Sequence, residues 1–238
     1  MHAGWWPLPS GSMTEAVASP PRGWLSIQVL LGIAGVLTFF VVPIHINTVY
    51  EGLPAHPLFV HVPVILIPTV ALGGLILVAK PDWFERHSAW LCALTVFALG
   101  ALNLTMGAGD ALRGDLGLYG NNTVANLISR HAAAAGKLRV FMIFFTAAFI
   151  VAVALERHAR GKSTGIGWID SLVGWVHSLV RGLKPVRIVM GLLALGCLYF
   201  VFLTGDLGAR AVWAGRLPSS PGAQARFPSP GGPPPPGQ

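Results

Sequence analysis

The sequence predicts an all-α integral membrane protein with five transmembrane helices. Of its 238 residues, 53% are hydrophobic and 11% are charged, and the mean hydropathy is +0.64. A soluble domain of this size carries about 25% charged residues. We expect the last four spans to form an antiparallel bundle within a membrane domain at 23–217. Five apolar stretches are long enough to cross a hydrocarbon layer of about 30 Å; they lie near 25–44, 58–79, 88–107, 138–155 and 188–204.

The positions of the basic residues predict which side of the membrane each loop occupies. Six of them lie in the loop between the fourth and fifth spans, and two more lie in the turn between the second and third. Because Lys and Arg are retained on the cytoplasmic side, we expect both loops and the N-terminus inside. This orientation places outside the loops at 45–57 and 108–135 and the C-terminus. Lys137 and Arg139 do not fit the rule, because they would lie at the outer end of the fourth span.

The segment before the first span, residues 1–22, is rich in Trp, Pro and Gly and shows no periodicity, so we expect it to be disordered. Met13 is an alternative start to Met1. The first apolar stretch, 25–44, is longer than the apolar region of a typical signal peptide, and no small-x-small cleavage site follows it. We interpret it as a retained transmembrane helix.

The second span opens with GLPAHPLFVHVPVIL, which combines two histidines with three prolines. Pro57 suits the first turn of a helix, where its missing N–H would be unpaired anyway. Pro63 and Pro68 lie further inside, and each frees a backbone carbonyl four residues earlier, that of Phe59 in the case of Pro63. Membrane helices accept this where neighbours satisfy the freed group. We therefore expect a bent helix whose His61 points into the bundle.

Polar residues from several connections are expected at one level of the membrane. A count of about 20 residues per crossing, started at the cytoplasmic edge, places them at the outer boundary. An ionisable group at this depth is costly and is therefore a candidate functional residue. The group comprises His45, Glu51, His56, His61, Asp110, His131, Lys137, Arg139 and Asp206.

Several of these residues also have a purely structural interpretation. His56, beside a proline, would serve as a helix cap or interface residue. Lys137 and Arg139 would extend to lipid phosphates. Asp110 and Asp206 each follow a glycine at a helix exit, where turn or cap roles are common.

The remaining segments contain one further helix and a polar tail. GWIDSLVGWVHSLVRGL, between the fourth and fifth spans, has apolar residues at helical spacing and predicts an interfacial helix at about 167–183 on the inner leaflet. The tail at 218–238 is rich in Pro and Gly and is expected to be disordered. Cys92 and Cys197 lie at different depths of two spans, which argues against a disulfide. No internal repeat and no phosphate-binding glycine loop is apparent.

Four motifs resemble those of a bacterial membrane family known as domain of unknown function 2231. They are H-P-x-x-x-H-x-P at 56–63, MGAGDAL at 106–112, RHAAAAGKLR before the fourth span and TGDLGARAVWAGRLP after the last. The resemblance covers about residues 52–217. Family members usually end with a Gly-Gly-x-Leu-Val-Tyr-like stretch, whereas this chain has Asp206 in place of the second glycine. The resemblance implies a bacterial inner-membrane protein, often adjacent to Rieske or c-type cytochrome domains, and implies no established activity.

The leading functional hypothesis is an electron-transfer protein of the inner membrane. Two imidazoles on facing helices can ligate a haem iron axially, so we predict a b-type haem held by His61 and His131 near the outer face. Lys137 and Arg139 would neutralise the haem propionates, and the small residues at 132–136 would admit the macrocycle. A helix bundle is the usual place for such a cofactor. The partner would be an outer redox protein, of the Rieske or c-type cytochrome kind, or a quinol.

Two other hypotheses come from different functional classes. A copper or zinc site, used for handling or transport of the ion, would draw on three histidines and one carboxylate. A structural or assembly subunit would use the same polar groups to hold helices together. A haem needs two histidines and a slot, whereas a small ion needs three or four converging side chains. The sequence identifies no catalytic residue. The candidate small-ion ligands are His56, His61, His131 and Asp110.

Overall fold

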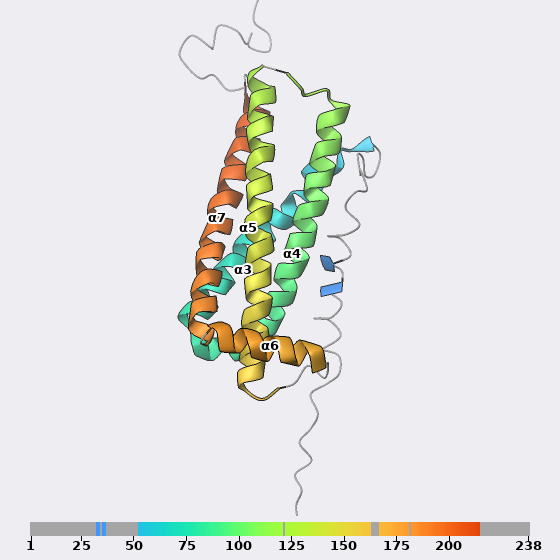
Figure 1. Ribbon diagram of the computed structural model, residues 1–238. Coiled ribbons are helices and arrows are strands. Elements are labelled where there is room, and N and C mark those ends of the chain that lie inside the picture. Colours follow the sequence, from blue (N-terminus) through green and yellow to red (C-terminus); the bar gives the residue numbers. More distant parts are fainter. Residues whose placement is uncertain are drawn as a thin grey trace, which may run out of the picture.

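The computed structural model describes the chain as a set of helices, with no strand beyond the single bridge residue Pro54 among the described residues (Figure 1). The described residues are 32–33, 35–36, 52–120, 122–162, 167–180 and 182–214. The helices are α2 (Ala55–Phe59), α3 (His61–Ala79), α4 (Pro81–Asp115), α5 (Thr123–Ala159), α6 (Gly167–Val180) and α7 (Leu183–Trp213).

Four helical segments are long and apolar enough to cross a membrane. They are Ala55–Ala79, which joins α2 and α3, and the helices α4, α5 and α7. They correspond to the second to fifth predicted spans, so the prediction of a helical membrane protein is confirmed to that extent. Of the predicted first span, residues 32–33 and 35–36 are described. They are helical, and Gly35 is so close to α4 that a Cβ there would lie 2.6 Å from the backbone of Val96. The other residues of that span, His45, Glu51 and the segments 1–22 and 218–238 lie outside the described part.

Helices α4 and α5 extend well beyond the predicted spans. The predicted loop at 108–135 is mostly helical, because α4 continues to Asp115 and α5 begins at Thr123. Asn122 caps α5 by accepting a 2.7 Å hydrogen bond from the backbone N–H of Ala125. A hydropathy count stops at the edge of the apolar stretch, whereas a helix continues until a cap or turn ends it. The 35 residues of α4 are about 52 Å long, which exceeds the thickness of a hydrocarbon core.

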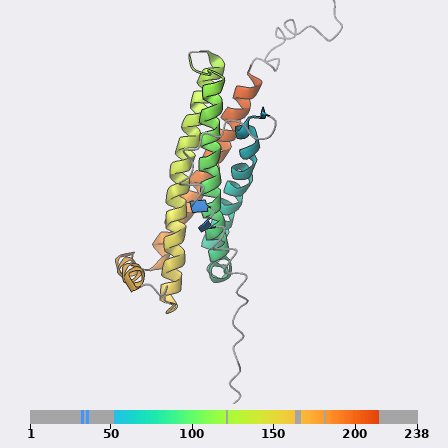
Figure 2. The same ribbon diagram turned by 90° about the vertical axis from the view of Figure 1, so that its right-hand side faces the viewer.

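The four long helices lie side by side around one apolar core (Figures 1 and 2). α3 packs against α4 and α7, and α5 packs against the same two helices. Aromatic rings fill the centre: Phe149 of α5 contacts Phe145 at 5.8 Å and Phe84 of α4 at 6.3 Å between ring centroids. Cys197 is buried in this core and Cys92 half-buried, and both thiols are free, as expected from their depths.

The segment Ala55–Ala79, which is the second predicted span, is interrupted near the prolines that predict a bend. α2 ends at Phe59 and α3 begins at His61, two residues before Pro63. The Phe59 carbonyl, which Pro63 cannot pair, accepts a 3.2 Å hydrogen bond from the Thr105 hydroxyl of α4. A neighbouring helix therefore satisfies the freed group, as the sequence predicts.

Helix α6 runs across the bundle near one end (Figures 1 and 2), and we call this the α6 end. It confirms the helix predicted at about 167–183, although it ends at Val180. None of its residues is buried, and Trp168 and Trp175 are 71% and 61% exposed. The ring of His177 lies 5.7 Å from that of His158 of α5, which joins the two helices.

Candidate functional site

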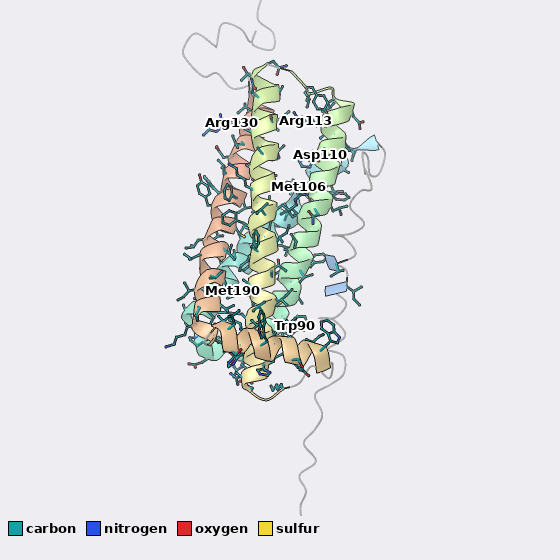
Figure 3. All side chains as sticks on the ribbon, viewed as in Figure 1. Trp90, Met106, Asp110, Arg113, Arg130 and Met190 are labelled. Carbon is teal, nitrogen blue, oxygen red and sulfur yellow. The ribbon has the colours of Figure 1, made fainter. Side chains whose placement is uncertain are left out.

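Two histidines from different helices meet at the end of the bundle opposite α6, which we call the histidine end. His56 of α2 and His131 of α5 have ring centroids 6.3 Å apart and ring planes at 86°. Both side chains are half-buried. Asp110 and two arginines, Arg113 and Arg130, mark the same end of the molecule (Figure 3).

His56 is held against α4 by a hydrogen bond and by a close fit. Its Nδ1 lies 2.9 Å from the backbone oxygen of Thr105. One turn further along α4, Gly109 leaves room for the ring, because a Cβ at that position would lie 2.8 Å from Nδ1. A Cβ atom and a ring nitrogen do not approach this closely in proteins, so residue 109 must be a glycine if the ring is to stay in this position.

His131 is held against α7 in the same way. Its Nδ1 lies 2.8 Å from the backbone oxygen of Thr204. Gly208, one turn further along α7, faces the ring, and a Cβ there would lie 3.1 Å from both Nδ1 and Cε1. Each histidine therefore contacts a threonine carbonyl and a glycine four residues apart on the next helix.

These hydrogen bonds fix the chemistry of both rings. A carbonyl oxygen can only accept, so Nδ1 must carry the proton in each histidine. In the neutral ring Nε2 then keeps its lone pair, which is the form that binds a metal. A carbonyl that accepts from the second ring nitrogen also orients the ring and raises its basicity as a ligand. In its neutral form each ring therefore has an Nε2 lone pair that is able to accept a proton or a metal ion.

The structure places His61 differently from its expected position. Its side chain is exposed, and its Nδ1 lies 3.2 Å from the Leu58 carbonyl of the preceding turn. The histidine next to His131 is His56, which the sequence favours as a cap or interface residue. No side chain caps α2, and His56 instead contacts α4 and α5.

The two aspartates of the predicted polar level have separate surroundings. Asp110, on α4 one turn beyond Met106, is exposed and is close enough to His56 to interact with it electrostatically. Asp206 pairs with Arg210 of its own helix, with 2.8 Å between Oδ2 and Nε. Its carboxylate is therefore neutralised locally.

The two basic residues expected near the cofactor, Lys137 and Arg139, are exposed on α5. They follow His131 by six and eight positions, which is about 9 and 12 Å along a helix. The described contacts join neither to the histidine pair.

Sequence reasoning missed the threonines and glycines that hold the rings. The available signal is a Thr-x-x-x-Gly spacing, present once in α4 and once in α7. The hydroxyl of Thr204 is also buried without a hydrogen-bond partner, whereas the backbone carbonyl of the same residue accepts the hydrogen bond from His131.

The separation of the rings suits a metal centre between them. Two imidazoles on opposite sides of one metal ion, at about 2.0–2.1 Å per bond, have ring centroids about 6 Å apart. In the part of the chain that the structure describes, no three His, Cys, Asp or Glu side chains form a group able to hold an ion. A zinc site takes three or four protein ligands, whereas a haem iron has four ligands of its own and takes two more.

The α6 end carries a different kind of polar cluster. Glu156 of α5 pairs with Arg187 of α7 at 2.8 Å and with Arg160 at 2.7 Å. Arg160 also pairs with Glu85 of α4, and Lys162 lies 3.7 Å from the same carboxylate. An open pocket between α4 and α5 is lined in part by Glu85, Glu156 and Arg160. These ion pairs tie together the ends of three crossing helices.

Comparison with known proteins identifies no relative, since no family model, no curated protein and no solved structure matches this chain.

Proposed function

We propose that this protein is a membrane electron-transfer protein that holds a b-type haem between His56 and His131. The observation that carries the proposal is the histidine pair, with a ring-centroid separation of 6.3 Å and both Nδ1 atoms bonded to carbonyls. Two ligands from two helices are what a haem requires of a protein. The proposal replaces His61 with His56 as the first ligand and keeps His131 as the second.

The residues around the pair suit a flat aromatic group. Small residues follow His131 at 132–136, and glycines line both rings. Lys137 and Arg139 remain the proposed partners of the propionates, and Arg113 and Arg130 lie at the same end (Figure 3). When bound, the haem would supply one-electron chemistry, and the chain would supply axial ligands, their orientation and a low-dielectric surrounding.

A copper or zinc site is the second candidate, and the electrostatic proximity of Asp110 to His56 favours it. In that case His56, His131 and Asp110 would bind the ion and His61 would have to turn toward them. A structural subunit with no cofactor is the third. Haem is preferred because the described pair is complete for an iron that already has four nitrogen ligands.

The proposed location is the bacterial inner membrane, with the histidine end outside and α6 on the cytoplasmic leaflet. The basic residues near α6 support this orientation. Exposed tryptophans on α6 suit the headgroup region, where an apolar ring with a polar N–H is most stable. The electron partner would be an outer redox protein, of the Rieske or c-type cytochrome kind, or a quinol.

The orientation can be tested by labelling introduced cysteines from outside the cell. A cysteine that replaces Ser229 should react with an impermeant reagent, and one that replaces Ser163 should react only after the membrane is opened. The reverse pattern would place the histidine end inside and exclude an outer partner.

The cofactor is tested with the full chain purified from haem-replete cells. Oxidised and dithionite-reduced spectra should show one b-type haem per chain, and elemental analysis should show iron rather than copper or zinc. His131→Ala should remove the reduced α-band, and His61→Ala, as the matched control, should retain it. A folded, colourless protein would refute the haem proposal. Copper or zinc lost on His56→Ala and Asp110→Asn would support the second candidate instead.

A further inference from the structure

We infer that the candidate site lies between two copies of one structural unit, and that each copy supplies one imidazole, one carbonyl and one glycine. The first unit is α2–α3 with α4, and the second is α5 with α7. The identity of the ligand rests on the proposed function, whereas the repeat and its positioning residues rest on the contacts described above. The inference assigns Gly109 and Gly208 as equivalent positioning residues.

Helices α3 and α5 are buried at equivalent positions, whereas in α2 the buried Ala55 corresponds to the exposed Arg130. His131 follows His56 by 75 residues. All six buried positions of α3, moved by the same 75 residues, fall on buried positions of α5. Identities are not kept, since Ile67 corresponds to Met142 and Val70 to Phe145, so the correspondence lies in burial. The six pairs are Pro63 and Leu138, Ile67 and Met142, Val70 and Phe145, Ala71 and Thr146, Gly74 and Phe149, and Leu77 and Ala152.

The second helices correspond with a different, again constant, offset. Thr204 follows Thr105 by 99 residues, and Gly208 follows Gly109 by the same number. Three of the five buried positions of α7 fall on buried positions of α4 at this offset, and the other two fall on half-buried Leu91 and Cys92. The three pairs are Thr95 and Ala194, Ala98 and Cys197, and Ala108 and Leu207.

The difference between the two offsets is explained by the segment that joins the two helices of each unit. The helices of the first unit are joined through Lys80 alone, whereas the segment between α5 and α7 contains α6. The offset therefore grows by 24 residues because the second unit carries an insertion that includes α6. The insertion lies at the α6 end, away from the two histidines (Figure 1).

The helix contacts agree with a two-fold relation along the bundle. An exchange of α3 with α5 and of α4 with α7 leaves the set of packed long-helix pairs unchanged. Under this exchange the hydrogen bond from His56 to Thr105 becomes that from His131 to Thr204. The two rings therefore lie next to each other at the approximate axis, with centroids 6.3 Å apart and planes at 86°, and a single metal centre there would take one ligand from each unit.

The proposed positioning role is tested by substituting the two glycines. Gly109→Ala and Gly208→Ala should each displace one ring, while Gly114→Ala and Gly205→Ala are matched controls on the same helices. A Cβ at 205 meets nothing within 4 Å, and one at 114 meets the Tyr119 hydroxyl at 3.9 Å. Both controls should keep wild-type spectra and melting temperatures no lower than wild type, since Ala favours a helix over Gly.

The readouts separate a positioning role from a general structural one. In haem-free protein in lipid discs, nitrogen-15 spectra of labelled histidine should show Nδ1–H tautomers for His56 and His131. Gly109→Ala should remove the first signal and leave the second, and Gly208→Ala should do the opposite. In haem-loaded protein both substitutions should shift the midpoint potential or weaken haem binding at least tenfold, and to a similar degree.

Double variants keep the inference falsifiable if a single substitution prevents folding. If the Cβ at 109 destabilises the protein by colliding with the ring of His56, then removal of the ring in His56→Ala should remove the collision. The double variant His56→Ala with Gly109→Ala should therefore melt no lower than His56→Ala alone. The pair His131→Ala with Gly208→Ala should behave alike. A double variant that melts lower, or a wild-type Nε2–H tautomer at either histidine, would overturn the inference. Absence of haem from wild type would refute the proposed function and leave the tautomer and double-variant tests in force.

Discussion

The two ends of the bundle satisfy their polar groups in different ways. At the α6 end, carboxylates and guanidinium groups neutralise one another, as Glu156 does with Arg160 and Arg187. At the histidine end, two imidazoles donate to backbone carbonyls and each keeps a second ring nitrogen. Most charges of the α6 end are neutralised by a partner, whereas each imidazole keeps an Nε2 that makes no hydrogen bond among the described residues. The contrast supports the proposal that the histidine end, rather than the α6 end, holds a ligand.

One buried polar atom at the α6 end has no hydrogen-bond partner among the described residues. The Nε of Arg187 is buried without a hydrogen-bond partner, while its guanidinium lies 4.6 Å over the ring of Phe84. Such a contact is worth about 0.5–2 kcal/mol. Arg160 donates two hydrogen bonds to the Glu156 carboxylate, and this contact raises the pKa of Arg160 above its ordinary value.

The largest expected effect is that of cofactor removal, which should act through the histidine end alone. A ligand at 1,000 times its dissociation constant stabilises the folded state by about 4 kcal/mol. Haem-loaded wild type should therefore unfold at higher denaturant than the haem-free form. His56→Ala and His131→Ala should abolish this difference, and Glu156→Gln should preserve it. A haem effect that survives both histidine substitutions would place the cofactor elsewhere.

The next effect should be confined to the α6 end. Glu156→Gln leaves Arg187, whose side chain is 14% exposed, without its carboxylate. We expect a loss of about 2–3 kcal/mol, because the removal of one member of a largely buried pair leaves the other charge uncompensated. Denaturant unfolding in mild detergent measures the loss. A change in the haem spectrum of this variant would contradict the separation of the two ends.

Hydropathy, proline chemistry and charge placement predict much of this molecule. The four described crossings, the satisfied carbonyl of Phe59 and the helix at Gly167–Val180 all follow from local rules. The choice between His56 and His61 does not, because it depends on where the helix breaks and on the space that Gly109 leaves. Both are tertiary properties.

The internal repeat is invisible in the sequence for a related reason. Its two units share buried positions and side-chain contacts but few residue types, as Ile67 with Met142 and Val70 with Phe145 illustrate. In an apolar bundle many side chains fill one site equally well if the neighbours change with them. The glycine and threonine pairs persist because a backbone carbonyl and an absent Cβ have no substitute at the two rings.

A smaller effect is expected at Thr105, whose carbonyl accepts a hydrogen bond from His56 and whose hydroxyl donates to the carbonyl of Phe59. Its single hydroxyl proton is shared between the Phe59 carbonyl at 3.2 Å and the Ala101 carbonyl at 2.8 Å. Thr105→Val keeps the shape and removes the donor, so we expect a loss of about 1 kcal/mol from the carbonyl that Pro63 leaves unpaired. Thr146→Val is the matched control, since that buried hydroxyl bonds the Met142 carbonyl of its own helix, and it should be nearly neutral. Equal losses would mean that the Phe59 contact contributes nothing.

The smallest effect is expected from Glu85→Gln, at the exposed edge of the α6 end. Glu85 is 49% exposed and pairs with Arg160 and Lys162, both of which are also exposed. Water and ions screen such pairs, so the loss should be about 0.5 kcal/mol and should vanish in about 1 M salt. The Glu156→Gln loss should persist in the same salt, because that carboxylate and Arg187 are shielded from solvent. Unfolding of both variants at low and high salt measures the difference. If the two losses fell together with salt, the Glu156 pair would be a surface pair as well, and the α6 end would owe its stability to the apolar core rather than to its charges.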